Sequence, residues 1–254
     1  MNETIKLQHK HRSIRSYKAE PISDEMLQAI IEAGQRASSS MNTQEISVIV
    51  VRDIERKAKI AELAGGQAWI AQAPVFITLV VDYNKTDMGV RKVGQTQIIH
   101  ESMEGLLVAG IDAGLVLANM MVAARSLGLG IVPIGGIRRN PPAMIDLLGL
   151  PPLTFPLVGL CIGHIEKDAP LKPRMEVSAF RHDERYDASH YQEAIDNYDA
   201  TIMEYWEKLG RTDGLTWSQY LGNNLKHVYY PQVKPVAAMQ GLLNDKYQCV
   251  GNEP

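Results

Sequence analysis

The 254-residue sequence has only two cysteines, Cys161 and Cys249, and no Cys-x-x-Cys pair. Two thiols so far apart exclude a disulfide framework, and the seven histidines show no spacing typical of a metal site. Cys161 stands inside an apolar run, where a small buried side chain is expected. The sequence therefore predicts a protein that needs neither disulfides nor a bound metal.

Three short motifs with well-understood mechanics are also missing. The chain has no Gly-x-Gly-x-x-Gly, no Gly-x-x-x-x-Gly-Lys-Ser/Thr and no Gly-x-Ser-x-Gly. The first two bring backbone amides close to phosphates, and the third exposes a nucleophilic serine. Their absence disfavours a Rossmann dinucleotide site, a P-loop and a hydrolase nucleophile. Any phosphate must therefore be bound by side chains.

An excess of one charge is lacking as well. The formal net charge is −3 and the isoelectric point is about 6.2, which gives no broad attraction for nucleic acid. Residues 1–10 have neither the apolar run of a secretory signal nor the Arg/Ser-rich composition of a transit peptide. The interpretation is a cytoplasmic protein that binds neither nucleic acid nor a membrane.

Two short cationic clusters stand out among the residues that are present. His11-Arg-Ser-Ile-Arg15 lies near the start, and Leu171-Lys-Pro-Arg174 lies far downstream. A phosphate monoester needs several charge-assisted donors at once, and arginine and lysine supply them in different geometries. Either cluster alone is more typical of a solvated turn. Together they indicate a phosphate-bearing cofactor.

Strands and helices alternate in the pattern of the first 164 residues. Runs rich in β-branched residues predict strands at 46–51, 75–82, 129–134 and 155–162. Ser23 is expected to cap a helix that ends near Arg36, and Asn140 a short helix that reaches Leu148.

Residues 101–127 form the longest apolar segment of the chain. Polar and charged residues recur within it and would be costly in lipid; they are Glu104, Asp112, Asn119 and Arg125. We therefore expect a buried central helix and no membrane span.

The last third of the chain predicts one further helix. Apolar residues recur every three or four positions from Tyr191 to Leu209, which favours an amphipathic helix over 187–209 with a core-facing stripe. Beyond Arg211 the chain is turn-rich. Since no repeat or linker marks a boundary, residues 1–254 are expected to form one domain, with an excursion from about residue 187 that packs over the body or a partner subunit.

Taken in order, the motifs resemble those of the flavin-dependent nitroreductase family. They are His11 to Arg15, Pro21-Ile-Ser, Ala37-Ser-Ser-Ser40, the Gly-Gly-Gln67 turn, the central apolar helix, Ser126-Leu-Gly-Leu-Gly130, Ile134-Gly-Gly-Ile-Arg138, Gly159-Leu-Cys-Ile-Gly163 and Leu171 to Arg174, with a weaker echo at Thr216-Trp-Ser218. The match is closest to the oxygen-insensitive, NADPH-preferring nitroreductase and flavin reductase branch. The resemblance implies an α+β sandwich, with a mostly antiparallel sheet flanked by helices, in an intertwined homodimer that holds FMN at its interface.

The same resemblance implies an FMN site that uses both cationic clusters. The residues implied for the phosphate and ribityl end are His11, Arg12, Ser13, Lys172 and Arg174. Arg15 would lie at the N1 and O2 edge of the flavin, where a fixed cation stabilises the negative charge of the reduced ring.

Further contacts with the flavin ring are implied for three other segments. Ile134, Gly135 and Gly136 would bring backbone amides to N5 and O4, where a Cβ would obstruct the approach; a plain tight turn is the alternative. Gln67 would bond the isoalloxazine or ribityl edge. The residues implied to reach the pyrimidine ring from the second subunit are Ser38, Ser39, Ser40 and Asn42, for which a solvated loop is the alternative.

Hydride transfer in two half-reactions is the activity that the resemblance implies. NAD(P)H would reduce FMN at N5 and leave, and a nitroaromatic, a quinone or free flavin would take the electrons, with no catalytic acid or base from the protein. Two alternatives stay open: a reductase that supplies reduced flavin to a partner, and a flavin-binding protein without enzymatic activity.

Three positions and the segment 210–214 depart from the family pattern. Pro133 stands where close relatives carry an aromatic residue, Trp69 where a tyrosine is common, and Met41 where relatives extend the serine run. Arg211 is the candidate for binding the 2′-phosphate of NADPH, but Asp213 opposes it, so NADH also stays open as the electron donor.

Overall fold

The computed structural model describes residues 1–244; Cys249 lies outside this range. Its contacts divide the chain into two compact units. The larger unit comprises residues 1–169 and the chain from residue 230, and the smaller unit comprises residues 170–229. Each unit is described by itself below, and the single domain expected from the sequence stays a prediction.

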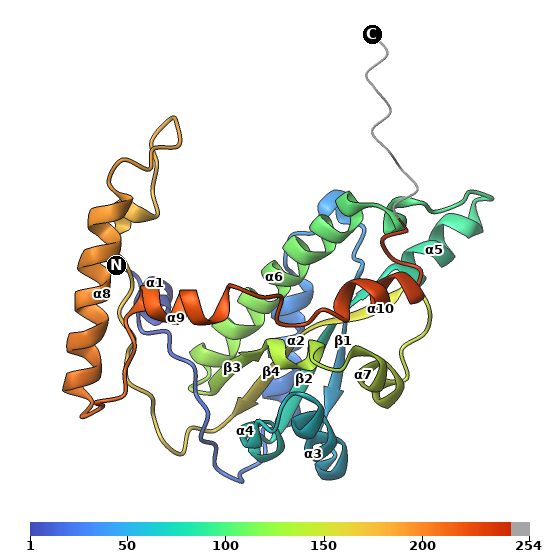
Figure 1. The fold of residues 1–254 in the computed structure, drawn as a ribbon. Helices are drawn as coiled ribbons and strands as arrows, with labels where there is room; N and C mark the ends of the chain where they lie inside the picture. Colours follow the sequence, from blue (N-terminus) through green and yellow to red (C-terminus); the bar gives the residue numbers. More distant parts are fainter. Residues whose placement is uncertain (245–254) are drawn as a thin grey trace. The chain divides into compact units, whose positions relative to one another are not determined.

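A four-stranded antiparallel sheet forms the centre of the larger unit (Figure 1). Its strands are β1 (Ile46–Val51), β2 (Val75–Asp82), β3 (Gly130–Ile134) and β4 (Thr154–Gly163), in the order β1-β2-β4-β3. All four predicted strands are present, with ends within one residue of the expected bounds. The predicted α+β class with an antiparallel sheet is confirmed.

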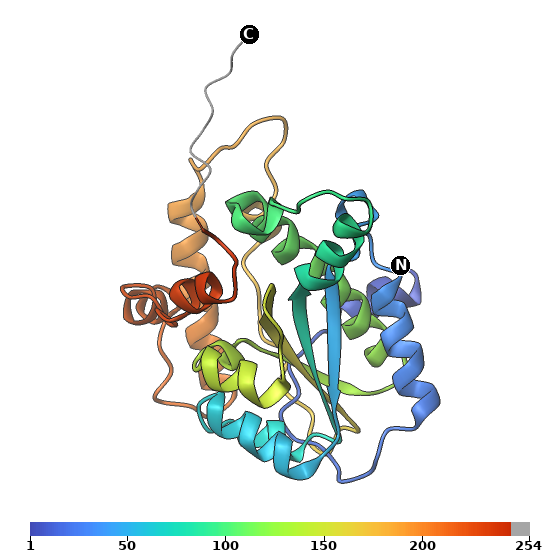
Figure 2. The same ribbon diagram turned by 90° about the vertical axis from the view of Figure 1, so that its right-hand side faces the viewer.

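Helices cover both faces of this sheet (Figure 2). On one face, α2 (Asp24–Gln35) packs against α6 (Met103–Ser126), and α6 lies against all four strands. On the other face are α3 (Ile54–Leu63), α4 (Ala68–Gln72) and α7 (Pro141–Leu148). The sheet therefore separates two apolar cores, one on each side.

Helix caps lie where the sequence predicts them. Ser23 Oγ accepts a hydrogen bond from Met26 N at 3.2 Å, and Asn140 Oδ1 accepts one from Ala143 N at 3.3 Å.

Other helices have no clear apolar period and were not expected; they are α1 (Glu3–His9), α5 (Tyr83–Lys92) and the short turns η1 (Ser40–Asn42), η2 (Ile99–Glu101), η3 (Gly135–Arg138) and η4 (Val177–Ala179).

The central helix α6 is buried on one face only. Ala109, Asp112 and Met120 are buried against the sheet and α2, whereas Leu107 is 55% and Ile111 62% exposed. The expectation of a buried helix therefore needs correction, since only about a fifth of the residues in its most apolar stretch are buried. By length and composition alone α6 could cross a membrane, but a core helix of a soluble protein passes the same test.

The C-terminal third contains more helix than the sequence indicates. The smaller unit holds α8 (Tyr191–Lys208), which begins four residues later than predicted, and α9 (Trp217–Asn224). The chain returns to the larger unit with α10 (Val233–Met239). The turn-rich reading beyond Arg211 is thus wrong for two helices, and the missed signal is a capping box of Thr216 and Gln219 that begins α9.

A close contact at Gly159 joins the two central strands. Gly159 lies on β4 opposite Thr78 of β2, and a Cβ built on it would come within 2.3 Å of the fully buried Phe76 ring. Real side chains do not approach so closely, so the large aromatic ring and the glycine are required together.

We expect Gly159→Ala to destabilise the fold by about 1–3 kcal/mol, because the added methyl group must displace Phe76 in a filled core. Urea unfolding monitored by circular dichroism measures the change. Gly89→Ala in α5 is the matched control: nothing lies within 4 Å of its added Cβ, so stability should stay unchanged or rise slightly. Equal stabilities for the two variants would contradict the expectation.

Candidate active site

The first cationic cluster runs along the outer edge of the sheet. Ile14 is fully buried and its N–H donates to Ile131 O at 2.9 Å, which anchors the segment on β3. Tyr17 follows with a bridge to Ile165, and its hydroxyl donates to Ile14 O at 2.7 Å. Burial of Ile14 leaves the neighbouring Arg15 side chain exposed.

Arg12 and His11 have different surroundings within the larger unit. Arg12 Nη1 donates to Asp168 Oδ2 at 2.9 Å and to Ala169 O at 3.3 Å, so a carboxylate holds this guanidinium in place. His11 N donates to Gln8 O, and the residue lines a cavity of about 270 Å³ beside Met121 and Arg125 of α6.

Arg15 lies over the indole ring of Trp69, with 5.6 Å between its Cζ and the ring centroid. A cation held against an aromatic face gains electrostatic stabilisation and loses orientational freedom. Within residues 1–244 no carboxylate lies in ion-pair distance of Arg15, in contrast to Arg12. Trp69 Nε1 is buried and has no hydrogen-bond partner among the described residues. The pair therefore presents an uncompensated cation and an unused donor.

Gln67, at the start of α4 and two residues before Trp69, meets Gly136. Gln67 Nε2 donates to Ala64 O at 2.9 Å, and a Cβ on Gly136 would lie 2.4 Å from Gln67 Nε2 and 2.6 Å from Ala64 O. Gly136 is thus required by packing against its own chain. A Cβ on Gly135 would lie 3.4 Å from Arg138 Nη2, an ordinary contact.

The serine segment lies on the opposite face of the sheet. Ser38, Ser39 and Asn42 line a cavity of about 660 Å³ together with Asp112 of α6 and residues of α2 and β1. Gln67 and Gly136 lie on the face of α3 and α4. The structure therefore does not bring the serine segment to the Gln67 side within one chain, and its role toward a second subunit stays a prediction.

The second cationic cluster belongs to the smaller unit. Lys172 Nζ lies 5.4 Å from the centroid of the Trp206 ring, and Arg174 Nη1 donates to Lys172 O and Pro173 O at 3.2 Å. Because the two clusters belong to different units, a joint phosphate site stays a prediction.

Arg211 is closely engaged within the same unit. Its Nε and Nη2 donate to the two carboxylate oxygens of Asp213 at 3.1 and 3.2 Å, and its Cζ lies 4.5 Å from the Trp206 ring centroid. The hydrogen bonds to Arg211 hold the pKa of Asp213 below its ordinary value. Asp213 therefore opposes Arg211, as expected, through an ion pair with two hydrogen bonds.

Cys161 behaves as the small buried side chain that the sequence predicts. It is fully buried, and burial raises the pKa of its thiol well above the ordinary range, so the thiol stays protonated and unreactive. Neighbouring Lys57 is also buried and donates through Nζ to Ala73 O at 2.5 Å. Among the described residues, no group of three or more potential ligand side chains is placed to bind a metal ion.

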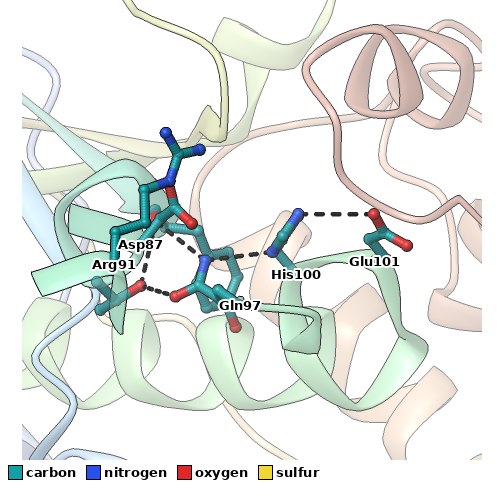
Figure 3. Close-up of polar contacts among 7 residues, drawn as sticks. Asp87, Arg91, Gln97, His100 and Glu101 are labelled. Carbon is teal, nitrogen blue, oxygen red and sulfur yellow. Dashed lines mark hydrogen bonds and ion pairs between the residues drawn. The ribbon is translucent and has the colours of Figure 1, made fainter. Parts of the chain in front are cut away.

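A polar cluster away from the residues described above lies between α5 and η2 (Figure 3). Gln97 Nε2 donates to Tyr83 O at 3.1 Å, which fixes the orientation of the amide, and lies 3.2 Å from His100 Nδ1. Since that amide nitrogen can only donate, His100 Nδ1 must accept, and burial lowers the pKa of this histidine. The backbone of η2 in turn accepts hydrogen bonds from Leu243 and Asn244. The cluster therefore anchors the returning chain.

Two family models match this chain. The model of the "Nitroreductase family" matches residues 9–164, and that of the "Nitroreductase family, C-terminal domain" matches residues 172–245. The chain belongs to the nitroreductase family. The first match spans more than half of the chain and includes the cationic segment, the serine segment, Gln67 and the glycine pair.

Relatives match over nearly the whole chain. An FMN reductase [NAD(P)H] of Bacillus subtilis (strain 168) is 44% identical over 251 residues, which cover 97% of this chain and 100% of that protein. An NADPH-flavin oxidoreductase of Vibrio harveyi is 34% identical over 243 residues, which cover 95% and 99%.

Solved structures agree with these matches. The structure of NfrA2 of B. megaterium has a TM-score of 0.94 at 42% identity and covers 97% of this chain and 100% of that chain. The NADPH:FMN oxidoreductase of Vibrio harveyi, complexed with NAD+, has a TM-score of 0.87 at 33% identity, with coverage of 95% and 99%. The nitroreductase fold is thus established.

The glycine pair of η3 allows packing and cofactor binding to be separated. If Gly135 lies at the flavin as the family resemblance implies, we expect Gly135→Ala to leave the thermal unfolding midpoint unchanged, because its Cβ clashes with nothing in the protein, but to weaken FMN binding by roughly tenfold. Fluorescence titration with FMN measures the affinity.

Gly136→Ala is the paired variant. It should destabilise the protein by about 1–3 kcal/mol, because its Cβ meets the Ala64 carbonyl oxygen. An unchanged FMN affinity of the Gly135 variant would remove Gly135 from the site.

Proposed function

We propose that this protein is an FMN-dependent oxidoreductase that takes electrons from NAD(P)H and passes them to a nitroaromatic compound, a quinone or free flavin. Support comes from membership of the nitroreductase family and from relatives named as an FMN reductase and a flavin oxidoreductase. The observation that carries the proposal is the uncompensated Arg15 cation over Trp69, a residue of the same short helix whose first turn brings Gln67 against Gly136.

The residues around Arg15 fit a flavin. Arg15 keeps donors for an acceptor such as the N1 and O2 edge of the ring, and Trp69 Nε1 is a buried donor in need of a partner. Bound FMN supplies the redox chemistry by accepting a hydride equivalent from the nicotinamide and passing the electrons on. The chain contributes binding and orientation. The Arg15 guanidinium places a positive charge at the site, and the Trp69 ring restricts the orientation of this guanidinium.

The other predicted cofactor residues are assigned by the same proposal. His11, Arg12, Ser13, Lys172 and Arg174 are proposed for the phosphate and ribityl end. Asp168 orients Arg12 and offsets part of its charge. Arg12 therefore contributes oriented hydrogen-bond donors more than net positive charge.

We further propose a homodimer with FMN at its interface. The large exposed apolar side chains of α6 are Met103, Leu107, Ile111 and Leu115, and a stripe of this kind is normally covered by a partner. Ser40 N donates to Asp112 on the same helix, so a partner on α6 would lie beside the serine segment. The excursion from about residue 187 is proposed to pack over the body or the partner, and the location to be cytoplasmic.

Reduction by each nucleotide tests the proposed function. Purified protein supplied with FMN should show flavin absorption that bleaches on anaerobic addition of NADPH or NADH. A bound flavin that neither nucleotide bleaches would assign the chain to flavin-binding proteins without activity, and failure to take up FMN would overturn the proposal.

The ion pair at Arg211 tests the nucleotide preference. We expect Asp213→Asn to lower the KM for NADPH by roughly three- to tenfold, because it releases the guanidinium for the 2′-phosphate, and to leave the KM for NADH unchanged. Steady-state kinetics with both nucleotides measure this. Arg211→Ala should raise only the KM for NADPH. Equal changes for both nucleotides would place the 2′-phosphate elsewhere.

A further inference from the structure

The indole ring of Trp206 is approached by cations from two segments that lie far apart in the sequence. Lys172 Nζ lies 5.4 Å and Arg211 Cζ 4.5 Å from the centroid of this ring. Since both distances are measured to one centroid, the two cations are no more than about 10 Å apart, where salt does not fully screen their repulsion. All three residues belong to the smaller unit. One aromatic ring therefore joins the second cationic cluster to the loop that follows α8.

Several contacts hold this indole in place at the end of α8. Trp206 Nε1 donates to Leu215 O at 3.0 Å, and Trp206 O accepts a hydrogen bond from Arg211 N at 2.9 Å. A Cβ built on Gly214 would come within 2.2 Å of Trp206 Cδ1, so the ring occupies the space that a side chain at residue 214 would need. Residues 209–215 are thus folded around Trp206.

Helix α8 also holds the second cationic cluster at another point. Tyr198 Oη donates to Pro173 O at 2.9 Å, and Tyr198 precedes Trp206 by about two helical turns, on the same side of the helix. The segment 171–174 therefore lies along this side of α8, with Pro173 at Tyr198 and Lys172 at Trp206. Trp206 is the residue at which this segment meets the loop of Arg211.

The contacts of Arg211 leave hydrogen-bond donors for an anion. A guanidinium has five N–H groups around its edge, and Arg211 uses one on Nε and one on Nη2 for Asp213. Its face is taken by the Trp206 ring. Among residues 1–244, no acceptor binds the remaining N–H groups. A planar set of donors with a fixed direction suits a phosphate group.

We propose that Trp206 is a positioning residue that holds Lys172 for the 5′-phosphate of FMN and Arg211 for the 2′-phosphate of NADPH. This role rests on the proposed function, which supplies the two ligands. Trp206 acts through the two cations. FMN differs from riboflavin, and NADPH from NADH, by one phosphate each. Loss of the ring should therefore affect only the phosphate-bearing member of each pair.

Trp206→Leu removes the ring and tests this role. We expect the KM for NADPH to rise by about three- to fivefold, with kcat and the KM for NADH unchanged, because the guanidinium loses a cation–π contact. The affinity for FMN should fall by about the same factor, and that for riboflavin should not change. Trp206→Phe keeps a ring that attracts cations less strongly, so its values should lie between those of wild type and Trp206→Leu.

Trp217→Leu is the matched control within the same unit. Trp217 begins α9 and packs edge-on against Tyr198, and in the part of the chain that the structure describes no cation lies over its ring. This variant should lose stability, as Trp206→Leu does, but keep both ligand preferences. Steady-state kinetics with both nucleotides and fluorescence titration with both flavins measure these effects, and thermal unfolding measures the stabilities.

The possible results separate the positioning role from a structural one. Equal changes for NADPH and NADH, or a Trp217→Leu variant with the same selective losses, would overturn the positioning role. A selective loss for NADPH with FMN binding unchanged would overturn the role at Lys172 and confine it to Arg211. If wild type takes up no flavin, the proposed function fails, whereas calorimetric titration with NADP+ and NAD+ still tests the role at Arg211. Should Trp206→Leu not fold, Trp206→Phe decides: a selective loss supports the role, and its absence overturns it.

Discussion

The antiparallel pairing of β2 with β4 is the contact on which the larger unit depends. These strands occupy the middle of the sheet, and β2 is buried along nearly its whole length. Each strand contributes side chains to the cores on both faces, so the pairing fixes the position of α6 on one side and of α3 and α4 on the other. The absence of a side chain at Gly159 leaves the space that the Phe76 ring occupies at this junction. Beyond β4, the chain continues to Ile165 and pairs with Tyr17, so the same strand also aligns the segment that carries Arg15.

The sequence predicts those parts of the fold that local chemistry determines. Runs of β-branched residues mark all four strands, and the side chains of Ser23 and Asn140 mark two helix starts. Helix α5 was missed because only Tyr83 and Asp87 of its ten residues are buried, too few for an apolar period. Helix α8 begins at Tyr191, the first residue of its apolar period, and not at Asp187. Strand order and the exposed face of α6 follow from long-range packing, which no local pattern encodes.

The same distinction applies to the site. The order of motifs indicates which residues belong to the nitroreductase pattern, but not how charges are matched. Arg12 faces Asp168, whereas Arg15 faces an indole ring, although the two arginines are close in sequence. Glu45 looks like an ordinary residue ahead of a strand, yet it is almost fully buried and accepts a hydrogen bond from Thr43. Local sequence gives no signal for this burial, since a carboxylate is ordinarily assigned to the surface.

Pro133 is a departure from the family pattern that the fold explains in part. It lies in β3, an edge strand of the four-stranded sheet, where a residue without an N–H can be accommodated. Along that outer edge, Ile131 O is already engaged by Ile14 N. One stretch of the edge is therefore covered by the chain itself, and the next offers no donor. A foreign strand finds no continuous row of hydrogen-bonding groups there, so this edge is protected against aggregation by strand addition.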